Sequence, residues 1–192
     1  MDDSQTLVYF PLGRFEERSA RFDGVSQTFH WLTVLLVIGQ FASALLHEQW
    51  HGAAAELLLT FHQSAGIATW ILVAMRLLWR RWFAYLPPFP AAMSMARQWA
   101  AKLNEYGLYL VLLLQPLTGL ATMLVFGRPF NLFLWQIPAL IAQDKPLAHL
   151  LKEMHETGAW VLAALIGLHA AAALFHGLVL RDRVLQRMLP DM

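Results

Sequence analysis

Residues 155–180 read HETGAWVLAALIGLHAAAALFHGLVL, and this stretch decides the fold. The part from Gly158 to Leu180 contains no Asp, Glu, Lys or Arg, and it is long enough to cross roughly 30 Å of bilayer hydrocarbon as one α-helix. It also carries His169 at depth, while His155 stands just before it. The stretch therefore predicts a transmembrane helix with imidazoles at two levels.

The rest of the chain has the same character. Of its 192 residues 58% are apolar and 14% are charged, which is typical of a membrane protein. Three more stretches approach the roughly 20 apolar residues that a spanning helix needs: Phe29 to Leu46, Leu57 to Trp79 and Leu103 to Phe126. The sequence predicts an all-α, integral membrane four-helix bundle over residues 29–180, with tails at 1–28 and 181–192.

The distribution of positive charge predicts the orientation. Eleven Lys and Arg side chains lie in the N-terminal tail, the second loop and the C-terminal tail: Arg14, Arg18, Arg21, Arg76, Arg80, Arg81, Arg97, Lys102, Arg181, Arg183 and Arg187. The first loop has none, and the third loop has Arg128, Lys145 and Lys152. The positive-inside rule then places both termini in the cytoplasm. In the outward third loop, Phe130, Phe133 and Trp135 suit an amphipathic interfacial segment.

Composition excludes several classes of function. A net charge of +1 gives no reason to expect nucleic acid as a partner. The absence of cysteine excludes disulfides, iron–sulfur clusters and covalent haem attachment, so a redox centre would need histidine or methionine ligands. The acidic N-terminal tail has no apolar core and does not resemble a cleavable signal peptide; its role is not predicted.

Four histidines sort into two depths. His155 and His169 are fourteen positions apart, which is about 1400° of helical rotation, close to four full turns, and about 21 Å of rise. Their rings thus leave one face at two levels. Under the predicted topology, His62 lies at the beginning of its helix near the outer face of the membrane. His30 lies at the beginning of its helix near the inner face. We expect the pairs His62/His155 and His30/His169.

Such pairs suit the axial ligation of two haem irons. Imidazole on both sides gives six-coordinate iron, which favours electron transfer over oxygen binding. Small residues near the histidines would leave space for flat porphyrins, although they are equally typical of helix packing: Gly66, Gly158, Ala159, Gly167 and Ala170–Ala173.

Three further residues leave alternatives open. Arg76 follows His62 by fourteen positions, so it is expected on the same helix face, as a propionate partner, a positive-inside anchor or both. His176 could replace His169 as the inner ligand. His149 is expected in a solvated loop.

The segment His47-Glu48-Gln49-Trp50-His51 matches the H-E-x-x-H pattern of zinc proteases. A working site needs a regular helix through the motif and a third ligand, whereas this segment is expected at the exit of the first helix. We interpret it as an interfacial cap with Trp50 at headgroup level.

The sequence resembles the bacterial cytochrome b561 family. The resemblance rests on Phe29-His30-Trp31-Leu32, His62-Gln63-Ser64-Ala65-Gly66 running to Arg76, Lys152-Glu153-Met154-His155-Glu156-Thr157, and Gly167-Leu168-His169-Ala170-Ala171-Ala172. It implies two non-covalent b haems at His30, His62, His155 and His169, a bacterial inner-membrane location in a respiratory chain, and electron exchange with ubiquinone or a similar quinone. Some members resemble superoxide:quinone oxidoreductases, and Arg128, Lys145 and Lys152 are the outward cations that would steer superoxide.

The leading hypothesis is a dihaem b-type cytochrome that acts as a quinone-linked oxidoreductase. An outer donor would reduce the His62/His155 haem, and the electron would be shared with the His30/His169 haem and passed to quinone. The alternative is a membrane anchor and electron conduit for a separate dehydrogenase or hydrogenase subunit.

Overall fold

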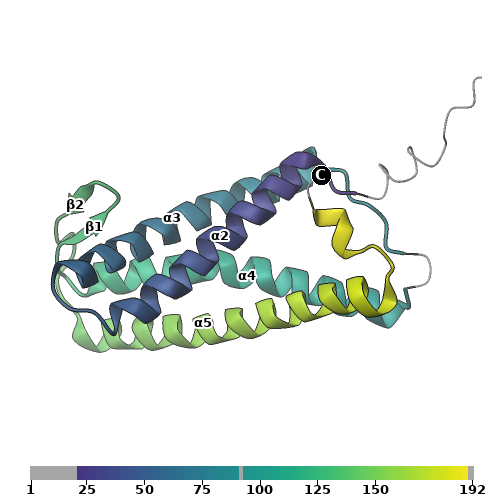
Figure 1. Cartoon of the computed structure of the whole chain (residues 1–192). Helices are drawn as coiled ribbons and strands as arrows, with labels where there is room; N and C mark the ends of the chain where they lie inside the picture. Colours follow the sequence, from purple (N-terminus) through teal and green to yellow (C-terminus); the bar gives the residue numbers. More distant parts are fainter. Residues whose placement is uncertain (1–20, 91–92, 190–192) are drawn as a thin grey trace, which may run out of the picture.

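The computed structural model describes residues 21–90 and 93–189 and consists almost entirely of long helices. The helices are α2 (Gly24–His47), α3 (Ala53–Trp82), α4 (Met95–Val125) and α5 (Lys145–Leu174), which continues as the π-helix η1 (Phe175–Leu180). Helix α2 packs along α3 and α4 along α5, while α3 joins the two pairs through α4 (Figure 1). All four are long and apolar enough to cross a membrane. The predicted four-helix architecture is confirmed.

Capping residues and prolines set the helix ends. Asp23 caps α2 by accepting a hydrogen bond from the Ser26 backbone N–H at 2.9 Å, and Asp144 caps α5 through Leu147 N–H at 3.1 Å. The break before α3 falls at Gly52, whose φ of +64° suits glycine. Between α3 and α4, prolines at 87, 88 and 90 prevent a continuous helix.

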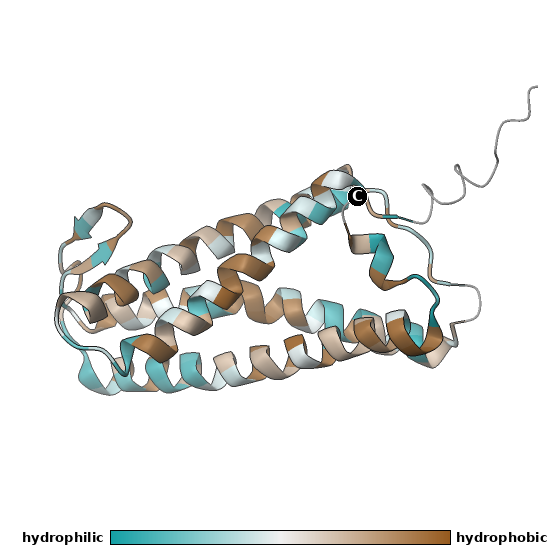
Figure 2. Cartoon of the chain, viewed as in Figure 1, coloured by the Kyte–Doolittle hydropathy of each residue, from teal (hydrophilic) through white to brown (hydrophobic). Residues whose placement is uncertain are grey.

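Large apolar side chains cover the outside of the bundle. Leu35, Ile38, Trp160 and Leu168 are each at least 60% exposed, whereas Thr33, Ser64, Thr69, Asn104 and Thr122 are buried. Figure 2 shows hydrophobic residues along all four helices, with hydrophilic residues gathered at the beginning of α5. Such a surface is costly in water but suits lipid, where helices associate through small and polar contacts.

The N-terminal end of α5 differs from the prediction. The helix begins at Lys145, well before Gly158, so His149 lies on a helix and not in a loop, although it remains exposed. The segment with Phe130, Phe133 and Trp135 is a β-hairpin of β1 (Phe130–Leu132) and β2 (Trp135–Ile137), paired antiparallel. Its Phe133 N–H donates to Ser64 Oγ at 2.7 Å, which fixes the hairpin to α3.

The C-terminal tail returns to the beginning of α2 (Figure 1). After η1, the chain forms the short 3-10 helix η2 (Leu185–Met188). Trp31 Nε1 donates to the Met188 carbonyl at 2.9 Å, and Phe22 N–H donates to the Arg187 carbonyl at 3.2 Å. The described part of the predicted tail 181–192 is therefore packed against the bundle. Most of the predicted N-terminal tail, residues 1–20, lies outside the described residues.

Candidate cofactor site

The structure brings the four predicted histidines together in the expected pairs. His62 on α3 faces His155 on α5 with ring centroids 6.1 Å apart, and His30 on α2 faces His169 on α5 with centroids 6.2 Å apart. Helix α5 has extensive contacts with α4 but not with α2 or α3. The ring pairs therefore join α5 to α3 and to α2, although these helices have few direct contacts with α5.

The spacing within each pair fits one metal atom between two imidazoles. Two metal–nitrogen bonds of about 2 Å, extended to the two ring centres, give a centroid separation of roughly 6 Å. Within residues 21–90 and 93–189, no cluster of three or more His, Cys, Asp or Glu side chains could hold a bare metal ion. A metal whose other ligands come from a planar ring, as in haem, fits these two-ligand sites.

A hydrogen bond orients the His62 ring. Its Nδ1 lies 3.0 Å from the Gln40 carbonyl and 3.4 Å from Ser43 Oγ. Because a carbonyl oxygen only accepts, Nδ1 carries the proton and the Nε2 lone pair is available to a metal. The Gln40 amide also ties α2 to α3 by donating to the Ala65 carbonyl at 3.1 Å.

The same arrangement supports His155 from α4. Its Nδ1 lies 3.1 Å from the Gln115 carbonyl and 3.1 Å from Thr118 Oγ1, and the Gln115 amide donates to the His155 carbonyl. Both supports are a Gln followed three positions later by Ser or Thr on the neighbouring helix. We did not predict these residues; the recurring Gln-x-x-Ser/Thr pattern within apolar helices was the available signal.

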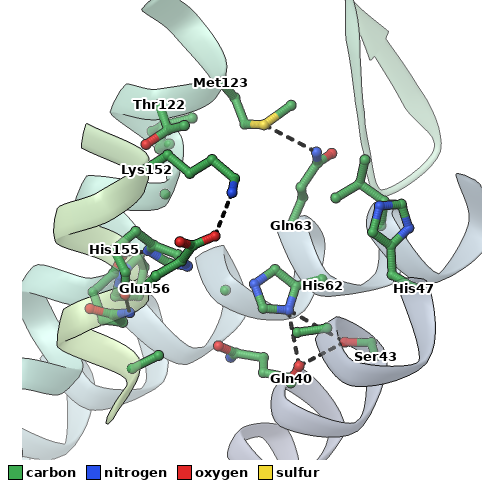
Figure 3. A pocket seen from close by; sticks show the side chains of 18 of the residues that line it. Gln40, Ser43, His47, His62, Gln63, Thr122, Met123, Lys152, His155 and Glu156 are labelled. Carbon is green, nitrogen blue, oxygen red and sulfur yellow. Dashed lines mark hydrogen bonds and ion pairs between the residues drawn. The ribbon is translucent and has the colours of Figure 1, made fainter. Parts of the chain in front are cut away.

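A cavity of about 530 Å³ adjoins the His62/His155 pair, with apolar walls and few polar groups. Figure 3 shows His62 between the α2 residues Gln40 and Ser43 and the α5 ion pair Lys152–Glu156, with His47 to one side. The hairpin supplies Phe130 and Leu132 to the lining, so it forms part of the cavity wall.

The small residues near the histidines divide into two groups. A side chain added at Gly66 or Gly167 would meet no atom within 4 Å, so open space adjoins both. At Gly158 an added Cβ would overlap the side-chain oxygen Oε1 of Gln115. Gly158 therefore serves the close approach of α4 and α5 and leaves no room for a porphyrin.

Arg76 lies near the His30/His169 pair and belongs to α3, the helix that also carries His62. It interacts electrostatically with both His30 and His169, and its guanidinium carbon stands 5.4 Å from the Tyr109 ring centre. No carboxylate forms an ion pair with it in the part of the chain that the structure describes.

The remaining histidines have other neighbours. His176 Nδ1 bonds to Asp182, so His169, and not His176, stands opposite His30. The His149 ring meets the Phe126 ring edge to face at 6.2 Å. Helix α2 ends at His47, whose Nδ1 lies 2.9 Å from the Ala55 carbonyl, so no regular helix presents His47 and His51 on one face.

Comparison with known proteins shows which family the chain belongs to. The sequence profile described as prokaryotic cytochrome b561 matches residues 21–191. The chain belongs to the prokaryotic cytochrome b561 family. Membership makes it a multi-pass bacterial membrane protein and a b-type cytochrome of membrane electron transfer, as the sequence resemblance indicated.

Individual relatives cover nearly the whole chain. Cytochrome b561 homolog 1 of Escherichia coli (strain K12) is 32% identical over 175 residues, 88% of this chain and 97% of that protein. Cytochrome b561 homolog 2 of the same organism is 31% identical over 182 residues, 91% and 94% of the two chains. A protein described as probable superoxide oxidase CybB of Yersinia pestis is 32% identical over 163 residues, 84% and 91%.

Proposed function

We propose that this b561-family protein binds two b haems, one between His62 and His155 and one between His30 and His169, and passes electrons to quinone. The observation that carries the proposal is the pair of ring separations, 6.1 and 6.2 Å, at two levels of one bundle. When bound, the two haems would supply reversible one-electron carriers.

The residues of the chain hold and insulate these carriers. If both histidines of a pair ligate the metal, they would leave it no open coordination position, which disfavours oxygen chemistry. The Gln40 and Gln115 carbonyls fix the tautomer of His62 and His155, so that the Nε2 lone pair of each ring would be available to hold the metal. Apolar helix faces exclude water, and Arg76 supplies positive charge at the inner level.

Superoxide is the proposed donor at the outer face. The similarity to a protein described as a probable superoxide oxidase supports this choice. Two superoxide ions each lose one electron and leave as O₂, and the two electrons with two protons convert one quinone to quinol. Lys152 is paired with Glu156, so Arg128 and Lys145 are the outward cations without an ion pair among the described residues. They would steer the anion.

The test is superoxide consumption by the purified chain in vesicles with and without quinone. We expect consumption that requires quinone, yields one quinol per two superoxide ions and falls as ionic strength rises, because steering is screened. Quinone-independent consumption, or none at all, would contradict the proposed reaction.

A second candidate function is an anchor and electron conduit for a separate catalytic subunit. The end of the bundle that is predicted to face outward carries the beginning of α5, from Lys145, and the β-hairpin. These elements offer a folded surface to which a soluble subunit could bind. Stable co-purification with a large dehydrogenase or hydrogenase, together with no activity of the isolated chain, would favour this function.

A further inference from the structure

The hydroxyl of Tyr109 is a buried polar group for which the described residues offer no hydrogen-bond partner. Its Oη is shielded from solvent and has no hydrogen bond in the part of the chain that the structure describes. Tyr109 lies on α4, the helix that contributes no histidine to the ring pairs. A buried hydroxyl left unpaired costs on the order of 1–3 kcal/mol, so such a group indicates a missing acceptor or donor.

Arg76 is the neighbouring charge, and it has no ion-pair partner among the described residues. Its guanidinium lies over the Tyr109 ring at 5.4 Å, and no described carboxylate pairs with it. Arg80, one turn further along α3, shows the contrast, because its Nη1 bonds to Glu105 Oε1 at 2.8 Å. A cation at membrane depth is costly unless an anion compensates it.

The two unpaired groups lie at the inner ring pair. Arg76 is close enough to His30 and His169 to interact electrostatically with both. Glu105, the nearest acidic side chain on α4, is already engaged by Arg80 through both of its oxygens. The missing partner is therefore an acceptor with negative charge that residues 21–90 and 93–189 do not supply.

We propose that Tyr109 and Arg76 together bind one propionate carboxylate of the inner haem. The Tyr109 hydroxyl would donate to one carboxylate oxygen, and the Arg76 guanidinium would donate to the same group and neutralise it. The inference rests on the proposed function, since the carboxylate belongs to the haem between His30 and His169. It assigns α4 a direct part in cofactor binding.

A carboxylate explains both groups better than a neutral ligand does. A quinone carbonyl would accept from Tyr109 but leave the Arg76 charge uncompensated. Water would form a hydrogen bond with the hydroxyl but would also leave the Arg76 charge uncompensated. The carboxylate could also belong to a bound fatty acid, and the experiment separates these two sources.

The experiment measures the rate at which the purified full-length protein loses haem to excess apomyoglobin. Wild type, Tyr109→Phe, Arg76→Gln and the double variant are compared, with Tyr106→Phe as control because Tyr106 is exposed on the same helix. The phase that belongs to the inner haem is identified with His155→Ala, which should retain that haem alone. Each protein is also loaded with the dimethyl ester of haem, which has no free carboxylate.

We expect Tyr109→Phe to speed the inner phase roughly tenfold, as the loss of a hydrogen bond to a charged group implies. Arg76→Gln should speed it more, and the double variant little beyond Arg76→Gln, because both groups act on one carboxylate. The outer phase and the Tyr106→Phe protein should match wild type. With the haem ester, Tyr109→Phe should have no effect.

Three results would overturn the inference. Tyr109→Phe could release the inner haem at the wild-type rate, or speed the outer phase alone. The effect could persist with the haem ester, which would assign the carboxylate to another molecule such as a fatty acid. A wild-type protein with one haem or none would contradict the proposed function itself, and the inference with it.

Discussion

His62 and His155 are supported differently from His30 and His169. Each ring of the outer pair bonds through Nδ1 to a carbonyl of a neighbouring helix, at 3.0 and 3.1 Å. In the described residues, the structure gives the rings of the inner pair no such bond. Because a bond from Nδ1 raises the basicity of the coordinating nitrogen, the two pairs are unequal ligands.

We predict that Thr118→Val weakens haem binding at the outer pair. The substitution removes the Oγ1 that lies 3.1 Å from His155 Nδ1 while nearly preserving side-chain volume. Loss of such a support typically costs 10- to 100-fold in affinity, and we expect about tenfold because the Gln115 carbonyl remains. The measurement is haem retention during dilution.

Thr122→Val is the matched control for this prediction. Thr122 lies one turn further along α4, and its hydroxyl bonds to the Thr118 carbonyl at 2.8 Å and to no histidine. Equal haem loss in the two variants would show that the hydroxyl contact with His155 is unimportant.

For single residues, the sequence predicts the candidate histidine ligands better than the residues that form hydrogen bonds with them. The fourteen-residue spacing of His155 and His169 is a property of one helix, so it can be read directly. Gln40, Gln115 and Tyr109 were missed because their relevance depends on which helix lies beside them. Helix neighbours in a bundle follow from tertiary packing that periodicity does not encode.

The beginning of α2 is held by a single carboxylate. Asp23 accepts from Ser26 N–H at 2.9 Å, from Ser26 Oγ at 2.7 Å and from Trp79 Nε1 at 3.1 Å, and so connects α2 to the end of α3. Partial burial raises the pKa of Asp23, but the hydrogen bonds from Ser26 and Trp79 outweigh it and hold the pKa below its ordinary 3.8.

We predict that Asp23→Ala destabilises the protein by about 1 kcal/mol, the usual value of an N-cap. Since the pKa of Asp23 is lower when folded, its contribution is complete above pH 3.8 and is lost as pH falls through the lowered value. The measurement is thermal unfolding as a function of pH. The wild-type protein should be more stable than Asp23→Ala at neutral pH and equally stable only at acid pH. A stability difference that does not change with pH would contradict the role of the charge.

Element boundaries show what hydropathy can predict. The apolar part of α5 from Gly158 was found, but its polar beginning from Lys145 was not, because hydropathy identifies the part within hydrocarbon and not the helix that extends into water. The hairpin was missed because its two-residue turn places Phe133 at a φ of +53°, which a residue of this type rarely adopts.

The whole molecule is a bundle whose two helix pairs, α2–α3 and α4–α5, face each other across the histidines. The four spans and their order could be predicted because each span is a long apolar segment. The distances between opposing rings could not, because they depend on helix tilt and side-chain rotamers.

The orientation of the bundle remains a prediction. The positive-inside rule places both termini in the cytoplasm and the third loop outside. Alkaline phosphatase, which is active only after export, should be active when inserted between residues 138 and 143 and inactive when fused after Met192. The reverse pattern would invert the assignment of inner and outer pairs.

The most direct test of the account is the number of haems per chain, measured by pyridine haemochrome assay against quantified protein. We predict two for wild type and for His149→Ala, whose ring is exposed, and one each for His155→Ala and His169→Ala. The ligand assignment would be contradicted if His155→Ala or His169→Ala retained two haems. The proposal of a dihaem protein would be contradicted if the wild-type protein lacked a Soret band after expression with ample haem.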